Sequence, residues 1–132
     1  MARKKRQSKL NFPFTAMPKH ITRSDAWFSC RPAARLIWFA VLERFDGANN
    51  GAISLSVREA AEYAGCSPNT AGRMFNELID AGLLICSQTS IFNSGKRLAR
   101  LWELTHLPKE GKVATNLWKS VSAKASSKRD TI

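Results

Sequence analysis

Apolar and polar positions recur at helical spacing across residues 56–84, in the segment SVREAAEYAGCSPNTAGRMFNELIDAGLL. Ser56 and Glu59 have the spacing of a capping box, in which each side chain satisfies a backbone N–H of the first helical turn. Gly65 supplies the positive-φ residue that ends a helix. The pattern predicts two short helices joined by a tight turn and followed at once by a strand.

The second of these helices begins with Ser67 as its N-cap and with Pro68 at its first position, where a missing N–H is harmless. Gly82 ends it. Its apolar residues recur at helical spacing and predict one buried face, made of Ala71, Met74, Phe75, Leu78 and Ile79.

The opposite face of this helix is small and hydrogen-bonding, with one cation and no acid. Its members are Asn69, Thr70, Gly72, Arg73 and Asn76. A recognition helix offers such residues to the major groove of DNA. The alternative is an ordinary pair of capped amphipathic helices. The order of residues across the turn, with strand signals on both sides, favours a helix-turn-helix.

Two further helices are predicted before this segment. A short one begins after Thr22 or Ser24 and places Trp27 and Phe28 inward. A longer one begins at Pro32 and carries a wide apolar stripe, formed by Leu36, Ile37, Ala40, Val41 and Phe45 and extended by Trp38, Phe39 and Leu42. We interpret the longer helix as the centre of the core. The alternative is a dimer seam around Trp38.

Short alternating stretches predict a small antiparallel sheet. Strands are expected at 52–55, at 83–88 and at 98–105, with turns at 46–51 and 92–95. Basic residues mark the last hairpin, with Lys96 and Arg97 at its tip and Arg100 on its flank. The expected fold is therefore mainly α with a small antiparallel β-hairpin, an α+β winged helix-turn-helix.

Charge divides the chain into three parts. The net charge is +11, but residues 21–106 carry nine basic and eight acidic side chains, so the excess lies in the two ends. We expect a basic N-terminal arm at 1–20, a winged helix-turn-helix domain at 21–107 and a basic, flexible tail at 108–132. Blocks of like charge commonly bind polyanions, although simple solvation is the alternative. The arm residues expected to contact DNA are Arg3, Lys4, Lys5 and Arg6.

The remaining composition narrows the class of protein. Cys30, Cys66 and Cys86 include no CxxC pair, and His20 and His106 stand alone, so we expect neither a metal nor a cofactor. No apolar run approaches the roughly 20 residues that span a bilayer, and no signal-peptide pattern opens the sequence. We expect a cytoplasmic, nucleoid-associated protein that does not contact membranes.

Residues 24–105 resemble the small bacterial winged-helix proteins related to plasmid replication-initiator and conjugal-transfer regulator domains. The similarity rests on SDAWFSCRPAARLIWFAVLERFDGANNGAISLS, on the helix-turn-helix segment and on the closing LWELT. The resemblance implies double-stranded DNA binding, usually regulatory, with no small-molecule ligand site and no catalytic residue. The basic ends are not part of the family pattern, and the wing is short.

These observations predict a sequence-selective double-stranded DNA-binding protein that represses or activates bacterial, plasmid or mobile-element genes. Asn69 and Asn76 are expected to read adenine and Arg73 guanine. Ser67 and Thr70 are expected to hold a phosphate. The basic hairpin and the arms would add backbone contacts.

The alternatives to this function are other kinds of nucleic-acid binding, protein binding and catalysis. A plasmid initiator that recruits replication proteins would use the same DNA chemistry, whereas RNA or ribosome binding and a purely protein-binding winged helix fit less well. An enzyme is not expected, because the sequence has no carboxylate cluster, Gly-rich phosphate loop or paired nucleophile and base. A homodimer on a pseudo-palindrome is expected, with a seam around Trp27, Trp38 and Phe39 or around Leu117 and Trp118.

Overall fold

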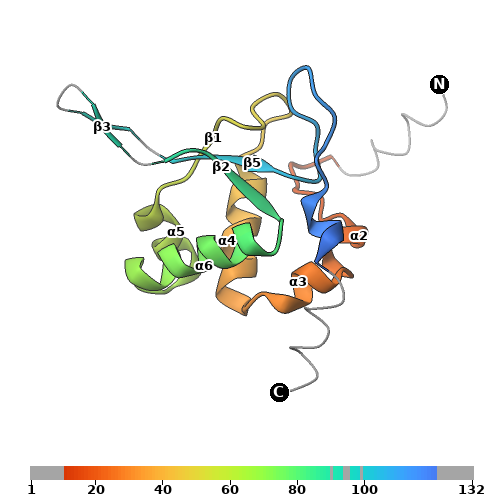
Figure 1. Ribbon diagram of the computed structural model, residues 1–132, viewed down its shortest axis with the longest axis horizontal. Coiled ribbons are helices and arrows are strands. Elements are labelled where there is room, and N and C mark those ends of the chain that lie inside the picture. The colour runs from red at the N-terminus through yellow and green to blue at the C-terminus, as the bar shows by residue number, and fades with distance from the viewer. Residues whose placement is uncertain (1–10, 90, 94–95, 99, 122–132) are drawn as a thin grey trace.

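Helices and a small antiparallel sheet combine in a mixed α+β fold (Figure 1). The structure is a computed structural model and describes residues 11–89, 91–93, 96–98 and 100–121. The helices in these residues are α2 (Lys19–Thr22), α3 (Asp25–Ser29), α4 (Pro32–Glu43), α5 (Val57–Ala64), α6 (Pro68–Asp80) and the 3₁₀ helix η1 (Leu117–Ser120). The strands are β1 (Ile53–Ser54), β2 (Leu84–Gln88), β3 (Ile91–Asn93), β4 (Lys96–Leu98) and β5 (Leu101–Leu104).

The main sheet has the order β1-β5-β2, with both pairs antiparallel. Trp102 lies at its centre, opposite Ile53 on one side and Cys86 on the other. Beyond a register shift between Cys86 and Gln88, β3 and β4 form a separate two-stranded ladder that projects from the body in Figure 1. The predicted strand at 98–105 is thus divided between β4 and β5, and the hairpin is longer than the sequence suggested.

Helix α4 forms the centre of the core, as the sequence predicted. The side chain of Trp38 is 0 % exposed, and its Nε1 donates a hydrogen bond to the Leu83 carbonyl oxygen at 3.4 Å. A dimer seam through Trp38 is therefore wrong, because this side chain has no surface to offer a partner.

Three side chains that the periodicity placed in apolar stripes are instead exposed. They are Phe28, Leu36 and Ile79. In α3 the buried position is taken by Ala26, and Cys30, which follows the helix as its C-cap, is buried too. The guanidinium of Arg35 lies 5.8 Å from the Phe28 ring centroid, so this exposed ring lies beside a cation rather than in the core. A five-residue helix has too few positions to bury both Trp27 and Phe28.

The C-terminal segment folds back onto the body up to residue 121, although residues 108–121 were expected to belong to a flexible tail. Trp118 is only 9 % exposed and belongs to the core, 5.4 Å from the His20 ring. The Asn116 N–H donates a hydrogen bond of 2.8 Å to the Thr105 carbonyl oxygen. A Cβ at Gly82 would lie 2.7 Å from the Leu117 carbonyl oxygen, so η1 covers the end of α6. The same burial removes Trp118 from the expected Leu117–Trp118 seam, whereas Leu117 is 46 % exposed.

Candidate nucleic-acid interface

Helix α5 is capped as the sequence predicted. The Ser56 Oγ accepts a hydrogen bond of 3.0 Å from the Glu59 N–H, and the Glu59 carboxylate accepts one of 3.0 Å from the Ser56 N–H. Gly65 ends the helix with a φ of 71°. These local contacts fix where α5 begins and where the turn to α6 starts.

The N-terminal end of α6 carries a small hydroxyl network. The Ser67 Oγ accepts a hydrogen bond of 3.1 Å from the Thr70 N–H and donates to the Thr70 Oγ1 at 3.0 Å. The Arg73 Nη2 donates to the same Thr70 Oγ1 at 3.2 Å. The three predicted site residues are therefore in contact, and the Thr70 hydroxyl orients the guanidinium along the helix.

The outward face of α6 contains the other predicted residues. Ser67, Asn69, Arg73 and Asn76 are exposed, and Thr70 is half-buried. On the inner face, the Phe75 ring stacks on Trp102 with centroids 4.2 Å apart and an interplanar angle of 9°. This stacking joins α6 to the central strand and determines which face of α6 points outward.

Charge on this face agrees with contact to a polyanion. Arg73 is the only charged side chain from Pro68 through Asn76. The next residue, Glu77, is an acid whose carboxylate contacts Arg31 at the start of α4. It accepts a hydrogen bond of 2.6 Å from the Arg31 N–H and lies 3.8 Å from the Arg31 guanidinium, so its negative charge is partly balanced there.

For the predicted hairpin residues Lys96 and Arg97, the structure describes the backbone pairing but not the side chains. Lys96 pairs with Asn93 and Arg97 with Phe92 in the β3–β4 ladder, so both follow the tip as strand residues. Their side chains lie outside what the structure describes, as do the arm residues Arg3, Lys4, Lys5 and Arg6. Phe92 and Asn93, which we expected in a turn, belong to β3.

Arg100 lies between β4 and β5 and is half-buried. Its Nε is shielded from solvent and has no hydrogen-bond partner. Its carbonyl oxygen accepts a hydrogen bond of 3.3 Å from the Leu55 N–H. Arg100 is thus fixed where the β3–β4 hairpin joins the main sheet, and its side chain is less accessible to solvent than expected for a surface cation on the flank of the hairpin.

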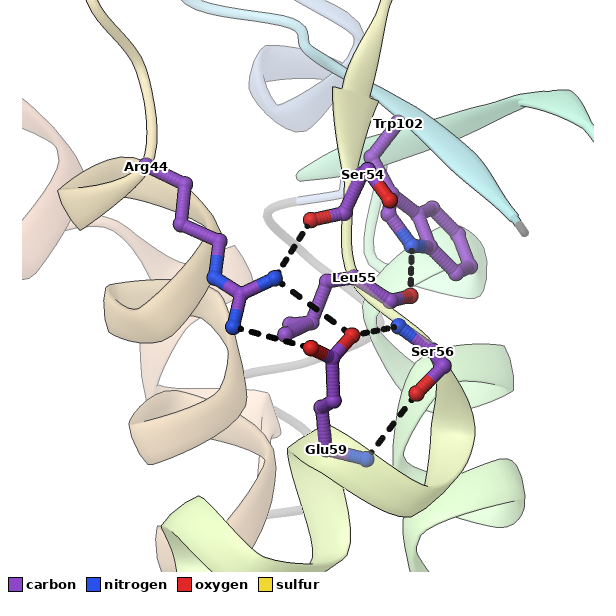
Figure 2. Close-up of polar contacts among 6 residues, drawn as sticks. All are labelled: Arg44, Ser54, Leu55, Ser56, Glu59 and Trp102. Carbon is purple, nitrogen blue, oxygen red and sulfur yellow. Dashed lines mark hydrogen bonds and ion pairs between the residues drawn. The ribbon is translucent and has the colours of Figure 1, made fainter.

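An ion pair that the sequence analysis missed connects α4 with α5 (Figure 2). The Arg44 Nη2 lies 3.3 Å from the Glu59 Oε2, and the Arg44 Nη1 donates to the Ser54 carbonyl oxygen at 2.8 Å. The Ser56 N–H and then Arg44 lower the pKa of Glu59. Figure 2 also shows the Trp102 Nε1 donating to the Leu55 carbonyl oxygen at 2.9 Å. Short contacts thus join α4, β1, α5 and β5.

Comparisons of the chain with protein-family models, with curated proteins and with solved structures find no match. Among the described residues, no group of three or more His, Cys, Asp or Glu side chains is arranged to hold a metal ion. None of the helices in that part of the chain combines the length and the apolarity that crossing a membrane requires.

Proposed function

We propose that this protein binds double-stranded DNA as a winged helix-turn-helix and regulates transcription. The observation that carries the proposal is the outward face of α6, which is polar, free of acids through Asn76 and held by the Phe75–Trp102 stack. A helix with such a face fits the major groove, where each base pair presents a distinct pattern of donors and acceptors.

Each residue of this face has a role that follows from its chemistry. Asn69 and Asn76 carry amides that pair with the donor and acceptor of adenine, and Arg73 carries the fork that pairs with guanine. Ser67 and Thr70, at the positive end of α6, bind a phosphate. The Arg73–Thr70 hydrogen bond supports a single continuous interface, because it holds the guanidinium beside the hydroxyls proposed to bind phosphate.

The β3–β4 ladder acts as the wing in this proposal. Lys96 and Arg97 contact the backbone or the adjacent minor groove, and the basic arm adds affinity that depends on salt. Two copies bind a pseudo-palindrome, since one such domain reads few base pairs. Their contact uses apolar side chains that the structure leaves exposed, such as Phe28 and Leu36.

The proposal is tested by selection from a random duplex library with the full chain, followed by footprinting of the enriched sequence. We expect enrichment of a short motif with a protected region on one face of the duplex. Equal retention of all duplexes would contradict sequence selectivity. Preference for single-stranded RNA over any duplex would replace DNA by RNA as the partner.

A further inference from the structure

A groove of about 490 Å³ lies beside the C-terminal end of α4. Three separate segments form its walls. Phe14 and Pro18 come from the residues before α2, Leu42 from the end of α4 with Phe45 just after it, and His106 and Leu107 from the turn after β5. No residue of α5, α6 or β2–β4 lines it. In Figure 1, α2 and α5 lie on opposite sides of α4, so the groove is separate from the proposed DNA face.

Two of these walls are held in place by specific contacts. The Asn50 amide, itself buried, donates hydrogen bonds to the carbonyl oxygens of Leu104 at 3.0 Å and Leu107 at 3.1 Å. The Pro18 carbonyl oxygen accepts hydrogen bonds from the first turn of α2, and Met17 packs against the core. The groove is therefore formed before any ligand arrives, as is usual for small-molecule sites of 300–1,000 Å³.

The charge of the groove differs from that of the chain. Glu43 is the one acid among the ten lining residues, which include two histidines, His20 and His106, but no Lys or Arg, although the chain contains 21 Lys and Arg. The neighbouring Arg44 is turned toward Glu59 and Ser54 and does not line the groove. His106 is neutral at pH 7, because burial, helped by His20, lowers its pKa to about 4.

Other features of the walls also favour a ligand with a positive charge. The groove lies at the C-terminal end of α4, and the dipole of a helix gives this end a partial negative charge. Phe14 and Phe45 supply aromatic rings, whose faces attract cations. Leu42, Pro18 and Leu107 supply apolar surface for the body of a ligand.

We propose that this groove binds a small organic cation, namely an amine or amidine carried on an apolar or aromatic body. The Glu43 carboxylate pairs with the positive group, and the apolar walls cover the body. An anion of the same shape is excluded, because the Glu43 carboxylate and the negative end of the α4 dipole repel it. The sequence analysis found no ligand site because the walls come from segments that are distant in the chain.

Three probes of the same shape test the proposal: phenethylamine, phenethyl alcohol and phenylacetate. Their affinity for the full chain at pH 7 is measured by calorimetry and by ligand-observed NMR. We expect phenethylamine to bind at least about tenfold more tightly than the other two, which corresponds to about 1.4 kcal/mol. Glu43→Gln should remove this preference. Glu62→Gln, a matched change at an exposed acid on α5 outside the groove, should leave it intact.

A second variant tests the location. Ala16 is an exposed lining residue, so Ala16→Lys adds a cation to the groove without disturbing the core, and we expect it to abolish phenethylamine binding. Equal affinity for the three probes, absence of saturable binding or equal losses in Glu43→Gln and Glu62→Gln would each overturn the proposal. None of these readouts uses DNA, so the outcome is independent of the proposed regulatory function.

Discussion

The ring of Phe75 lies flat against the ring of Trp102, with centroids 4.2 Å apart. Phe75 comes from the inner face of α6, and Trp102 is the central residue of the three-stranded sheet. A rotation of α6 about its axis would break this stack. The stack therefore connects the packing of the core to the direction in which Asn69, Arg73 and Asn76 point.

Phe75→Leu should lower the free energy of unfolding by about 1–3 kcal/mol, because it removes the aromatic pair and leaves part of the site unfilled. Urea unfolding followed by tryptophan fluorescence measures the change. Ile79→Ala is the control: helical spacing puts both residues on one face, but Ile79 is 37 % exposed, so its loss should be below about 1 kcal/mol. Equal losses would show that Ile79 is also part of the core.

Arg73→Ala should weaken binding to the selected duplex by about 1–3 kcal/mol and binding to random duplex much less. The reason is that base contacts discriminate between sequences, whereas phosphate contacts do not. Arg23→Ala is the matched control, because Arg23 is an exposed cation that follows α2, far in sequence from α6. Equal weakening on both duplexes would make Arg73 a phosphate contact.

Deletion of residues 1–9 should reduce affinity for every duplex and flatten the dependence of log affinity on log salt. Each phosphate contact that is lost changes the slope by about 0.9. Titrations at several salt concentrations measure this slope for the full chain and the deletion variant. The ratio of specific to random affinity is the internal control and should stay constant, since the arm is proposed to carry charge alone. An unchanged slope would mean that the arm stays solvated on DNA.

Stability should fall between pH 7 and pH 5 because of His106. Its ring lies 5.4 Å from Trp38, and burial followed by the charge of His20 lowers its pKa from 6.5 to about 4. Below pH 6.5 the unfolded chain binds a proton that the folded chain takes up only near pH 4, so acid favours unfolding in this window. Because part of the ring is accessible to solvent, we expect a loss of about 1 kcal/mol at pH 5.

Urea unfolding at the two pH values measures this effect, with the loss in His106→Gln compared with the loss in the unmodified chain. The variant should lose less stability on acidification, whereas His20→Gln should behave almost as the parent. The low pKa of Glu59 does not interfere, because a carboxylate with a lowered pKa loses its contribution only as the pH falls below its ordinary value of 4.5. An identical loss in His106→Gln would assign the effect to other groups.

The sequence predicted best the features that neighbouring residues determine. The capping box at Ser56, the Ser67 cap and the positive φ at Gly65 each depend on contacts within a few residues. Periodicity also identified α4 as the core helix. It failed at Phe28 and Ile79, since burial there depends on which other elements cover the end of a helix.

Features formed by distant residues could not be read in this way. The Arg44–Glu59 pair joins two helices, and the docking of Trp118 brings the C-terminal segment beside α2 and the end of α6. Residues 108–121 were expected to be a tail because their composition is basic and polar. Composition alone does not show that one tryptophan in the segment packs in the core. Because one large aromatic ring buries much apolar area, it can hold a polar segment against the body of the protein.

The close approach of Leu117 to Gly82 also bears on how the protein is made. Synthesis proceeds from the N-terminus, so η1 leaves the ribosome after every other described element. Until then the end of α6 and the rings around His20 lack their cover, and the helix that faces DNA in our proposal rests on an incomplete core. A nascent chain that has emerged only as far as α6 would therefore bind DNA poorly, and binding would begin once η1 has also been released.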